Sequence, residues 1–166
     1  MIITPILVIL LVVVFILLFL FLKTVDERKW LTGIISLVLT PFVYFYMLYP
    51  FINIVSNYHH QKYFDSEAWL EKPALRYEMI DSTIETDTLK GKTKSEIEAL
   101  LGKAEWLTWD DAKKAHDPNK WNYGLGIEPG AFTDEKSNVE ITFTNNKVST
   151  LKAYTEPITF DDVEKE

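Results

Sequence analysis

The chain has 166 residues, no cysteine and a formal net charge of −7. Without cysteine it has no disulfide framework, no thiolate metal site and no cysteine nucleophile. Charge is unevenly distributed, because residues 1–22 carry none whereas residues 64–166 carry 13 basic and 22 acidic side chains. An acidic polar region repels phosphate, and this argues against nucleic acid as a partner.

The first apolar run, residues 2–22, is long enough to cross a bilayer. As a helix it spans roughly 31 Å, close to the hydrocarbon thickness of about 30 Å. A cleaved secretory signal is the alternative, but no Lys or Arg precedes the run and no small-residue cleavage site comes after it. We therefore expect a retained transmembrane helix over about 2–22.

A second apolar run extends over about 30–55 and contains Pro41 and Pro50. Proline bends a helix, which a membrane helix tolerates where neighbours cover the freed carbonyl, and Pro50 is a candidate helix end. Trp30 at one end and three tyrosines near the other are typical of interfacial aromatic belts. Together the runs predict a transmembrane hairpin over residues 1–63.

The hairpin is expected to be an anchor in the lipid bilayer, because neither run contains Asp, Glu, Lys, Arg or His. An oligomeric pore lined by Ser or Thr is the alternative. The turn over 23–29 carries three basic side chains. The positive-inside rule then places this turn in the cytoplasm, with the N-terminus and residues 64–166 on the extracytoplasmic side of the cytoplasmic membrane.

Helices are expected in two places after the hairpin. Asp65 and the two residues after it form a helix-start signal, and the apolar stripe beyond them predicts one helix, or two short ones, over about 66–85. Thr93 and Glu96 form a capping box, and Gly102 suits a helix C-terminus, so a short helix is expected over 94–101.

The sequence beyond residue 103 predicts antiparallel strands. Residues 139–144 alternate between apolar and polar, which indicates a half-buried strand, and Asn145-Asn146 can turn the chain at positive φ. Strands are expected over 104–109, 121–125, 139–144 and 147–155, with polar loops at 110–120 and 126–138. The expected fold class is α+β, with two helices packed on a three- or four-stranded antiparallel sheet.

The motif L-x-G-K-T-x-x-E-I-x-x-L-L-G at 89–102 resembles the SmpA/OmlA (BamE-like) envelope domains of bacteria. The segments W-x-Y-x-L-G at 121–126 and V-E-I-T-F-T-N-N-K-V at 139–148 are similar, in order and spacing, to the later segments of that family, and W-x-x-x-P-x-x-R-Y-x-M at 69–79 is similar to a subset of it. The motif positions expected to be structural are Leu89, Gly91, Thr93, Glu96, Leu100, Leu101 and Gly102.

This resemblance implies an α+β domain over roughly 65–155, similar to the beta-lactamase-inhibitor-protein fold, whose members bind other proteins. It implies no enzyme activity and no cofactor. Family members are often lipoproteins tethered through an N-terminal cysteine, which this chain lacks. The hairpin would replace that tether, which favours the cytoplasmic membrane over an outer-membrane assembly complex.

Two polar segments are candidates for chemistry. Asp110, Asp111, His116 and Asp117 supply metal-ligand atoms, but two lysines lie among them and the spacing matches no calcium loop, so we expect a solvated loop and no metal. The alternative is an enzyme that uses these carboxylates on cell-surface material. The pair at 59–60, His-His, is expected to be interfacial, with a pH switch as the alternative.

Aromatic residues of the strands are the candidate binding site. Alternation places Trp121 and Tyr123 on one face, whereas Trp106 and Trp109 have opposite parity, so that one of them faces outward. An exposed patch of such rings binds proteins well. We expect a membrane-anchored extracytoplasmic interaction domain whose partner is another envelope protein, with the enzyme or an accessory subunit of a membrane complex as alternatives.

Overall fold

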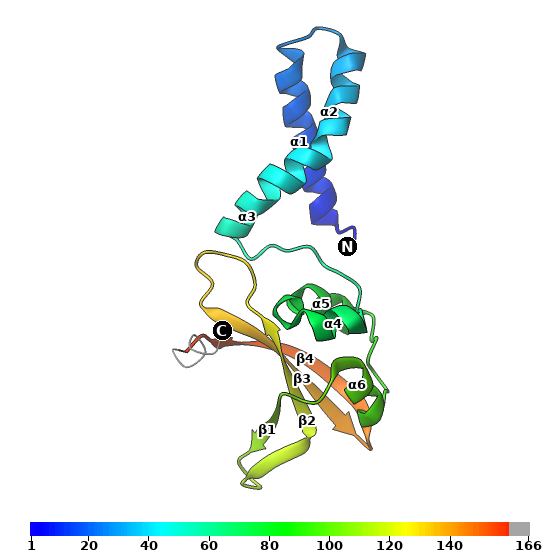
Figure 1. The fold of residues 1–166 in the computed structure, drawn as a ribbon, viewed down its shortest axis with the longest axis vertical. Coiled ribbons are helices and arrows are strands. Elements are labelled where there is room, and N and C mark those ends of the chain that lie inside the picture. Colours follow the sequence, from blue (N-terminus) through cyan, green and yellow to red (C-terminus); the bar gives the residue numbers. More distant parts are fainter. Residues whose placement is uncertain (160–166) are drawn as a thin grey trace. The chain divides into compact units, whose positions relative to one another are not determined.

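The computed structural model describes residues 1–159, and the chain divides into two compact units. One unit is formed mainly by residues 2–58 and is helical. The other is formed mainly by residues from 59 onward and contains both helices and strands (Figure 1).

The helical unit is a hairpin. Helix α1 covers Pro5–Lys23, and it begins at Thr4, whose side chain accepts a hydrogen bond from the Leu7 amide at 3.3 Å. The second arm consists of α2 (Lys29–Val43), a π-helical segment η1 (Tyr44–Leu48) and α3 (Tyr49–Val55). Both helices predicted from the sequence are therefore present. The helix continues past Pro50 to Val55, so the end considered at Pro50 is wrong.

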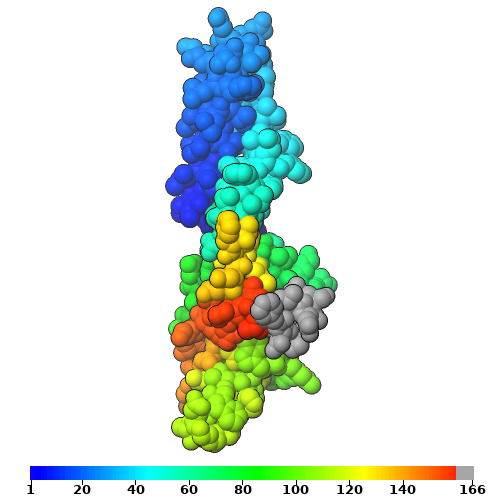
Figure 2. All heavy atoms as spheres, turned by 90° about the vertical axis from the view of Figure 1, so that its left-hand side faces the viewer, coloured from blue at the N-terminus to red at the C-terminus, as the bar shows by residue number. Residues whose placement is uncertain are grey.

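Both arms are long and apolar enough to cross a bilayer. In the most apolar 18-residue window of each arm, only 11% of the first and 22% of the second are buried. A core helix of a water-soluble protein would be mostly buried, so these helices do not have that character. Figure 2 shows their atoms in blue and cyan, with α1 and α2 side by side.

The buried face of α2 consists of small hydroxyl side chains. Thr32, Ser36 and Thr40 recur every fourth residue and are the buried residues of α2. Ser36 and Thr40 each donate a hydrogen bond of 2.7 Å to the carbonyl four residues earlier in the same helix. Small side chains at this spacing let two helix backbones approach closely.

The second unit has the α+β composition expected from the sequence. Its helices are α4 (Ser66–Glu71), η2 (Pro73–Leu75), α5 (Tyr77–Glu85) and α6 (Lys94–Leu101). Its strands are β1 (Trp106–Asp110), β2 (Ala115–Gly126), β3 (Glu135–Thr144) and β4 (Lys147–Pro157). They form one antiparallel sheet in the order β1-β2-β3-β4, which confirms the four-stranded alternative.

Helix ends agree with the capping signals. The Asp65 carboxylate accepts from the Ala68 amide at 2.7 Å, and Thr93 and Glu96 form the complete capping box. Gly102 ends α6 at a φ of +83°, which favours glycine. The stretch over 66–85 is interrupted before Pro73, because proline disfavours helical geometry in the residue that precedes it. The alternative of two short helices over 66–85 is therefore confirmed, and the described part of the second unit has three α-helices where the expected fold class had two.

Two of the four strands, β2 and β3, begin earlier than the sequence predicts, whereas β1 begins two residues later, at Trp106, and β4 begins at Lys147 as predicted. β2 starts at Ala115 and β3 at Glu135, so the expected loops over 110–120 and 126–138 are shorter. Polarity suggested loops, but exposed hairpin strands tolerate polar side chains because their backbone pairing does not depend on burial. The turn at Asn145-Asn146 is confirmed, with φ of +51° and +63°.

One hydrophobic cluster contains buried residues of the helices and of the strands. The rings of Trp69 and Tyr123 lie 6.1 Å apart within it. Motif residues Leu89 and Leu101 are fully buried there, Leu100 packs against the cluster, and Gly91 has a φ of +77°. The motif therefore supplies helix caps and core contacts.

The guanidinium group of Arg76 is buried in this unit and contacts several of its segments. Arg76 is only 6% exposed, and its Nε donates to the Trp69 carbonyl at 2.8 Å while Nη1 donates to the Gly124 carbonyl at 2.9 Å. Nη1 also pairs with the Glu105 carboxylate, which accepts from the Gly124 amide at 2.8 Å. The guanidinium lies 4.9 Å from the centre of the Trp69 ring. One side chain therefore joins a helix, a strand and the segment between them.

Candidate binding groove

The sheet carries a groove on the side opposite to its apolar residues. Tyr123, Val139 and Ile141 belong to the hydrophobic cluster, and residues of the other parity face away from it. A row of cross-strand partners, Trp106, Asn122, Glu140 and Lys152, runs across all four strands on this second side. The groove has a volume of about 510 Å³ and is lined by residues 106–109, Asn122, Glu140, Lys152, Tyr154 and Glu156.

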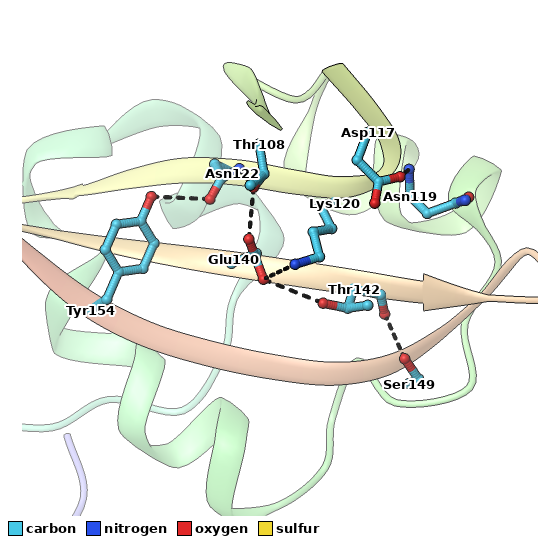
Figure 3. A network of polar contacts seen from close by, with 9 residues as sticks. All are labelled: Thr108, Asp117, Asn119, Lys120, Asn122, Glu140, Thr142, Ser149 and Tyr154. Atoms are coloured by element: carbon cyan, nitrogen blue, oxygen red, sulfur yellow. Dashed lines mark hydrogen bonds and ion pairs between the residues drawn. The ribbon is translucent and has the colours of Figure 1, made fainter. Parts of the chain in front are cut away.

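Hydrogen bonds fix the polar floor of the groove (Figure 3). The Tyr154 hydroxyl donates to Asn122 Oδ1 at 3.0 Å, and Asn122 Nδ2 donates to Thr108 Oγ1 at 2.9 Å. Thr108 in turn donates to Glu140 Oε2 at 2.6 Å. Asn122 is only 1% exposed, so each polar atom of its amide needs the partner that it has.

The remaining oxygen of Glu140 is also occupied. Oε1 lies 3.7 Å from Lys120 Nζ and accepts a long hydrogen bond of 3.5 Å from Thr142 (Figure 3). Burial is the main cause that raises the pKa of the Tyr154 phenol, so this hydroxyl stays protonated and keeps donating at neutral pH. The side chains of Tyr154, Asn122, Thr108 and Glu140 are therefore already engaged with one another.

Two tryptophans form the exposed wall of the groove. Trp106 is 38% exposed and Trp109 is 50% exposed. Simple alternation would put them on opposite faces, but the β1–β2 register shifts between Leu107 and Trp109, and both residues line the groove. Trp109 is held by an edge-to-face contact of 5.2 Å with His116.

The other two aromatics proposed from the sequence lie elsewhere. Tyr123 is fully buried in the cluster, where its hydroxyl donates to the Gly102 carbonyl at 3.0 Å and burial raises its pKa. Trp121 lies on the same face as Tyr123, as alternation predicts, and its ring contacts Phe143 at 4.8 Å. Trp106 and Trp109 therefore line one groove, whereas Trp121 and Tyr123 lie on the side of the sheet that carries the hydrophobic cluster.

Seven groove residues were not selected from the sequence: Leu107, Thr108, Asn122, Glu140, Lys152, Tyr154 and Glu156. The sequence does contain a signal for Glu140. Because side chains of β3 alternate between the two faces of the sheet, Glu140 must point away from the core if Val139 and Ile141 point into it. Tyr154 required knowledge of the β3–β4 register, which pairs it with Asn138.

Two of the three carboxylates considered for catalysis or metal binding, Asp110 and Asp117, accept hydrogen bonds from nearby backbone amides. Asp110 accepts from the amides of Ala112 and Lys113 and pairs with Lys113 Nζ at 3.0 Å, contacts that lower the pKa of the Asp110 carboxyl. Asp117 accepts from the Asn119 amide at 2.9 Å. In residues 1–159 no three His, Asp, Glu or Cys side chains are grouped so that they could hold a metal ion.

The histidine pair lies at the start of the second unit. The His59 ring makes an edge-to-face contact with Tyr77 at 4.9 Å. Burial is the largest cause that lowers the pKa of His60, so this imidazole is neutral at pH 7.

No protein-family model, no curated protein and no solved structure matches this chain. The resemblance to the SmpA/OmlA domains therefore stays a prediction that rests on the motif residues.

Proposed function

We propose that this protein is a membrane-anchored interaction domain. The hairpin holds it in the cytoplasmic membrane, and the α+β unit binds another envelope protein on the extracytoplasmic side. In this proposal α4, α5 and α6 form a layer against one face of the sheet and leave the opposite face for the partner. The motif resemblance suggests a role in the assembly or maintenance of a bacterial envelope.

The anchor is supported by the composition and low burial of the two helical arms. Their outward surface consists of aliphatic and aromatic side chains, which water would disfavour and lipid accommodates. The three basic residues of the turn at 23–29 favour its retention in the cytoplasm, which would put both ends of the hairpin outside.

One observation carries the interaction role: Trp106 and Trp109 remain exposed beside a polar floor that is already hydrogen-bonded. Exposed tryptophan next to a rigid floor binds with little loss of side-chain entropy, and tryptophan is enriched at binding hot spots. Asp110 and Asp117, two of the three acids considered for catalysis, instead accept hydrogen bonds from local backbone amides, which favours binding over catalysis.

Topology is testable by thiol labelling, because the chain has no cysteine background. Thr150→Cys in the exposed part of β4 and Glu27→Cys in the hairpin turn would be treated with a membrane-impermeant maleimide on intact cells. We expect Thr150→Cys to react at once and Glu27→Cys to react only after permeabilisation. The reverse pattern would refute the proposed orientation.

Docking is testable by photo-crosslinking in intact cells. A photo-reactive amino acid would replace Lys152 in the groove or, as a control, Glu98 on the exposed side of α6. We expect a discrete protein adduct from position 152 only, lost in W106A/W109A and retained in F132A, which removes an exposed aromatic outside the groove. Equal adducts from both positions, or none from position 152, would refute groove docking.

A second candidate function, an accessory subunit of a membrane complex, is favoured by one feature of the hairpin. An apolar groove of about 660 Å³ is lined by α1 residues such as Leu17 and by Met47 and Phe51 of the second arm. A helix of another membrane protein would fit such a surface by packing alone. Crosslinking from position 47 in place of position 152 would favour this second function.

A further inference from the structure

We propose that the groove recognises an extended protein segment through a basic side chain, arginine or lysine, which lies against Trp106 and Trp109 and pairs with the Glu156 carboxylate. This inference rests on the proposed function, since it takes the groove to be a docking site for a protein. It adds which chemical group of the partner protein the groove recognises.

The aromatic wall favours a cation. Trp106 and Trp109 expose their rings, and Tyr154 closes the lining nearby. The face of an indole ring is electron-rich and attracts an ammonium or guanidinium group, with tryptophan the strongest of the aromatic side chains. The same chemistry already operates inside the protein, where the Arg76 guanidinium lies over the Trp69 ring.

Glu156 supplies the charge that such a cation needs. Its carboxylate accepts a 3.2 Å hydrogen bond from Asn138 Nδ2, and none of the ion pairs within residues 1–159 includes it. A carboxylate has about four acceptor positions, so Glu156 can accept from a ligand without breaking its contact with Asn138.

The other carboxylate of the groove is already neutralised. Glu140 accepts from Thr108 and lies 3.7 Å from Lys120. Lys152, which lines the same groove, is an exposed cation whose long side chain can turn towards solvent. A cationic ligand gains the carboxylate of Glu156, whereas an anionic ligand would be repelled by it and could gain only Lys152.

A glycan fits the floor less well. A sugar needs several donors and acceptors that are free to bind its hydroxyls, but both polar atoms of the Asn122 amide are committed to Tyr154 and Thr108. Breaking these contacts would leave a buried amide unsatisfied. The acidic surroundings, 22 acidic against 13 basic residues over 64–166, also increase the encounter rate with a basic segment.

The test uses the full chain in nanodiscs of phosphatidylcholine, a lipid with no net charge, so that basic peptides do not bind the bilayer. Three fluorescent heptapeptides of Gly, Ser and Thr would carry arginine, citrulline or glutamate at the central position, and a chitotetraose conjugate would represent glycans. Citrulline keeps the shape and most donors of arginine and removes its charge. Affinity would be measured by anisotropy at low and high salt.

We expect the arginine peptide to bind at least about tenfold more tightly than the citrulline peptide, and less tightly at high salt. Glu156→Gln should reduce this preference severalfold, whereas Glu98→Gln, which removes the same charge outside the groove, should leave it unchanged. W106A/W109A should weaken binding of both peptides. Circular dichroism would confirm that each variant is folded.

The outcomes separate this inference from the proposed function. Equal binding of the arginine and citrulline peptides would overturn the inference and leave groove docking of a protein intact. Binding of chitotetraose in preference to every peptide would overturn both. Absence of any peptide binding, with the adduct from position 152 present in cells, would overturn the inference alone.

Discussion

Replacement of Arg76 by methionine tests whether a single buried cation holds the α+β unit together. Methionine is similar in length and apolar, so the change removes charge and hydrogen bonds without opening a large cavity. Three kinds of contact disappear: the ion pair with Glu105, the hydrogen bonds to two backbone carbonyls, and the stacking on Trp69.

The magnitude depends on the exposure of each partner. The Glu105 side chain is 39% exposed and can be rehydrated, so loss of its ion pair contributes about 1 kcal/mol. The two orphaned carbonyls contribute about 1 kcal/mol each, at the lower end of the penalty for unsatisfied buried groups. The contact with the Trp69 ring adds about 1 kcal/mol. Arg76→Met should therefore lower the free energy of unfolding by about 4 kcal/mol.

Urea unfolding of the full chain in nanodiscs, monitored by tryptophan fluorescence, measures this change. With a denaturant slope of about 2 kcal/mol/M, the midpoint should fall by about 2 M. Lys103→Met, which removes an exposed cation, is the matched control and should leave the midpoint unchanged. Arg76→Lys should recover little, because an ammonium cannot reproduce the planar geometry of the guanidinium.

A double-mutant cycle with Glu105→Ala completes the test. We expect Glu105→Ala to be less destabilising by about 1 kcal/mol once Arg76 is already methionine. A loss below about 1.5 kcal/mol for Arg76→Met, or strict additivity of the two substitutions, would show that the guanidinium network does not stabilise the unit in this way.

Three further substitutions test individual elements. Gly126→Ala should lower the free energy of unfolding by about 2–4 kcal/mol, because its φ is +96° and the new Cβ would lie 2.2 Å from a backbone oxygen of η2; a midpoint shift within error would contradict the close approach. Thr93→Ala should lower the free energy of unfolding by about 1 kcal/mol through loss of the α6 cap. The hydrogen bonds of the cap lower the pKa of the Glu96 carboxyl below its ordinary value of 4.5, so the stability that this carboxylate contributes is complete above pH 4.5 and is lost as the pH falls through the folded pKa. In an acid titration, Thr93→Ala should therefore lose less stability over this pH range than the wild type does. An unchanged profile would argue against the capping box. Tyr154→Phe should lower the free energy of unfolding by about 1–2 kcal/mol, because it leaves a buried oxygen of Asn122 without its donor, and thermal unfolding that matches the wild type would contradict the network.

Local signals in the sequence predicted the local structure well. The capping box at Thr93 and Glu96, the cap at Asp65 and the turn at Asn145-Asn146 each depend on residues at most three positions apart, and all are present. The alternation of β3 also identified its buried face. These features need no knowledge of distant partners, which is why they could be predicted.

The groove depends on longer-range information. Trp109 joins Trp106 because of a register shift between β1 and β2, which no periodicity reveals. Tyr154 meets Asn122, 32 residues earlier, only because β4 pairs with β3 and β3 with β2. The sequence predicted one outward tryptophan in β1, whereas both Trp106 and Trp109 are exposed, and that these rings bind a partner stays a prediction. Alternation could have pointed to Glu140, but the place of Asn122 and Tyr154 beside it required the sheet order.

The hydroxyl groups of Thr32, Ser36 and Thr40 have a consequence for how the proposed transmembrane hairpin would enter a bilayer. Ser36 and Thr40 are satisfied by carbonyls of their own helix, so these two side chains present no unmet donor to lipid even when the second arm is alone. Each arm would then be a competent membrane segment on its own, and close packing would come after insertion as a separate event. Isolated peptides of either arm should consequently partition into vesicles without their companion.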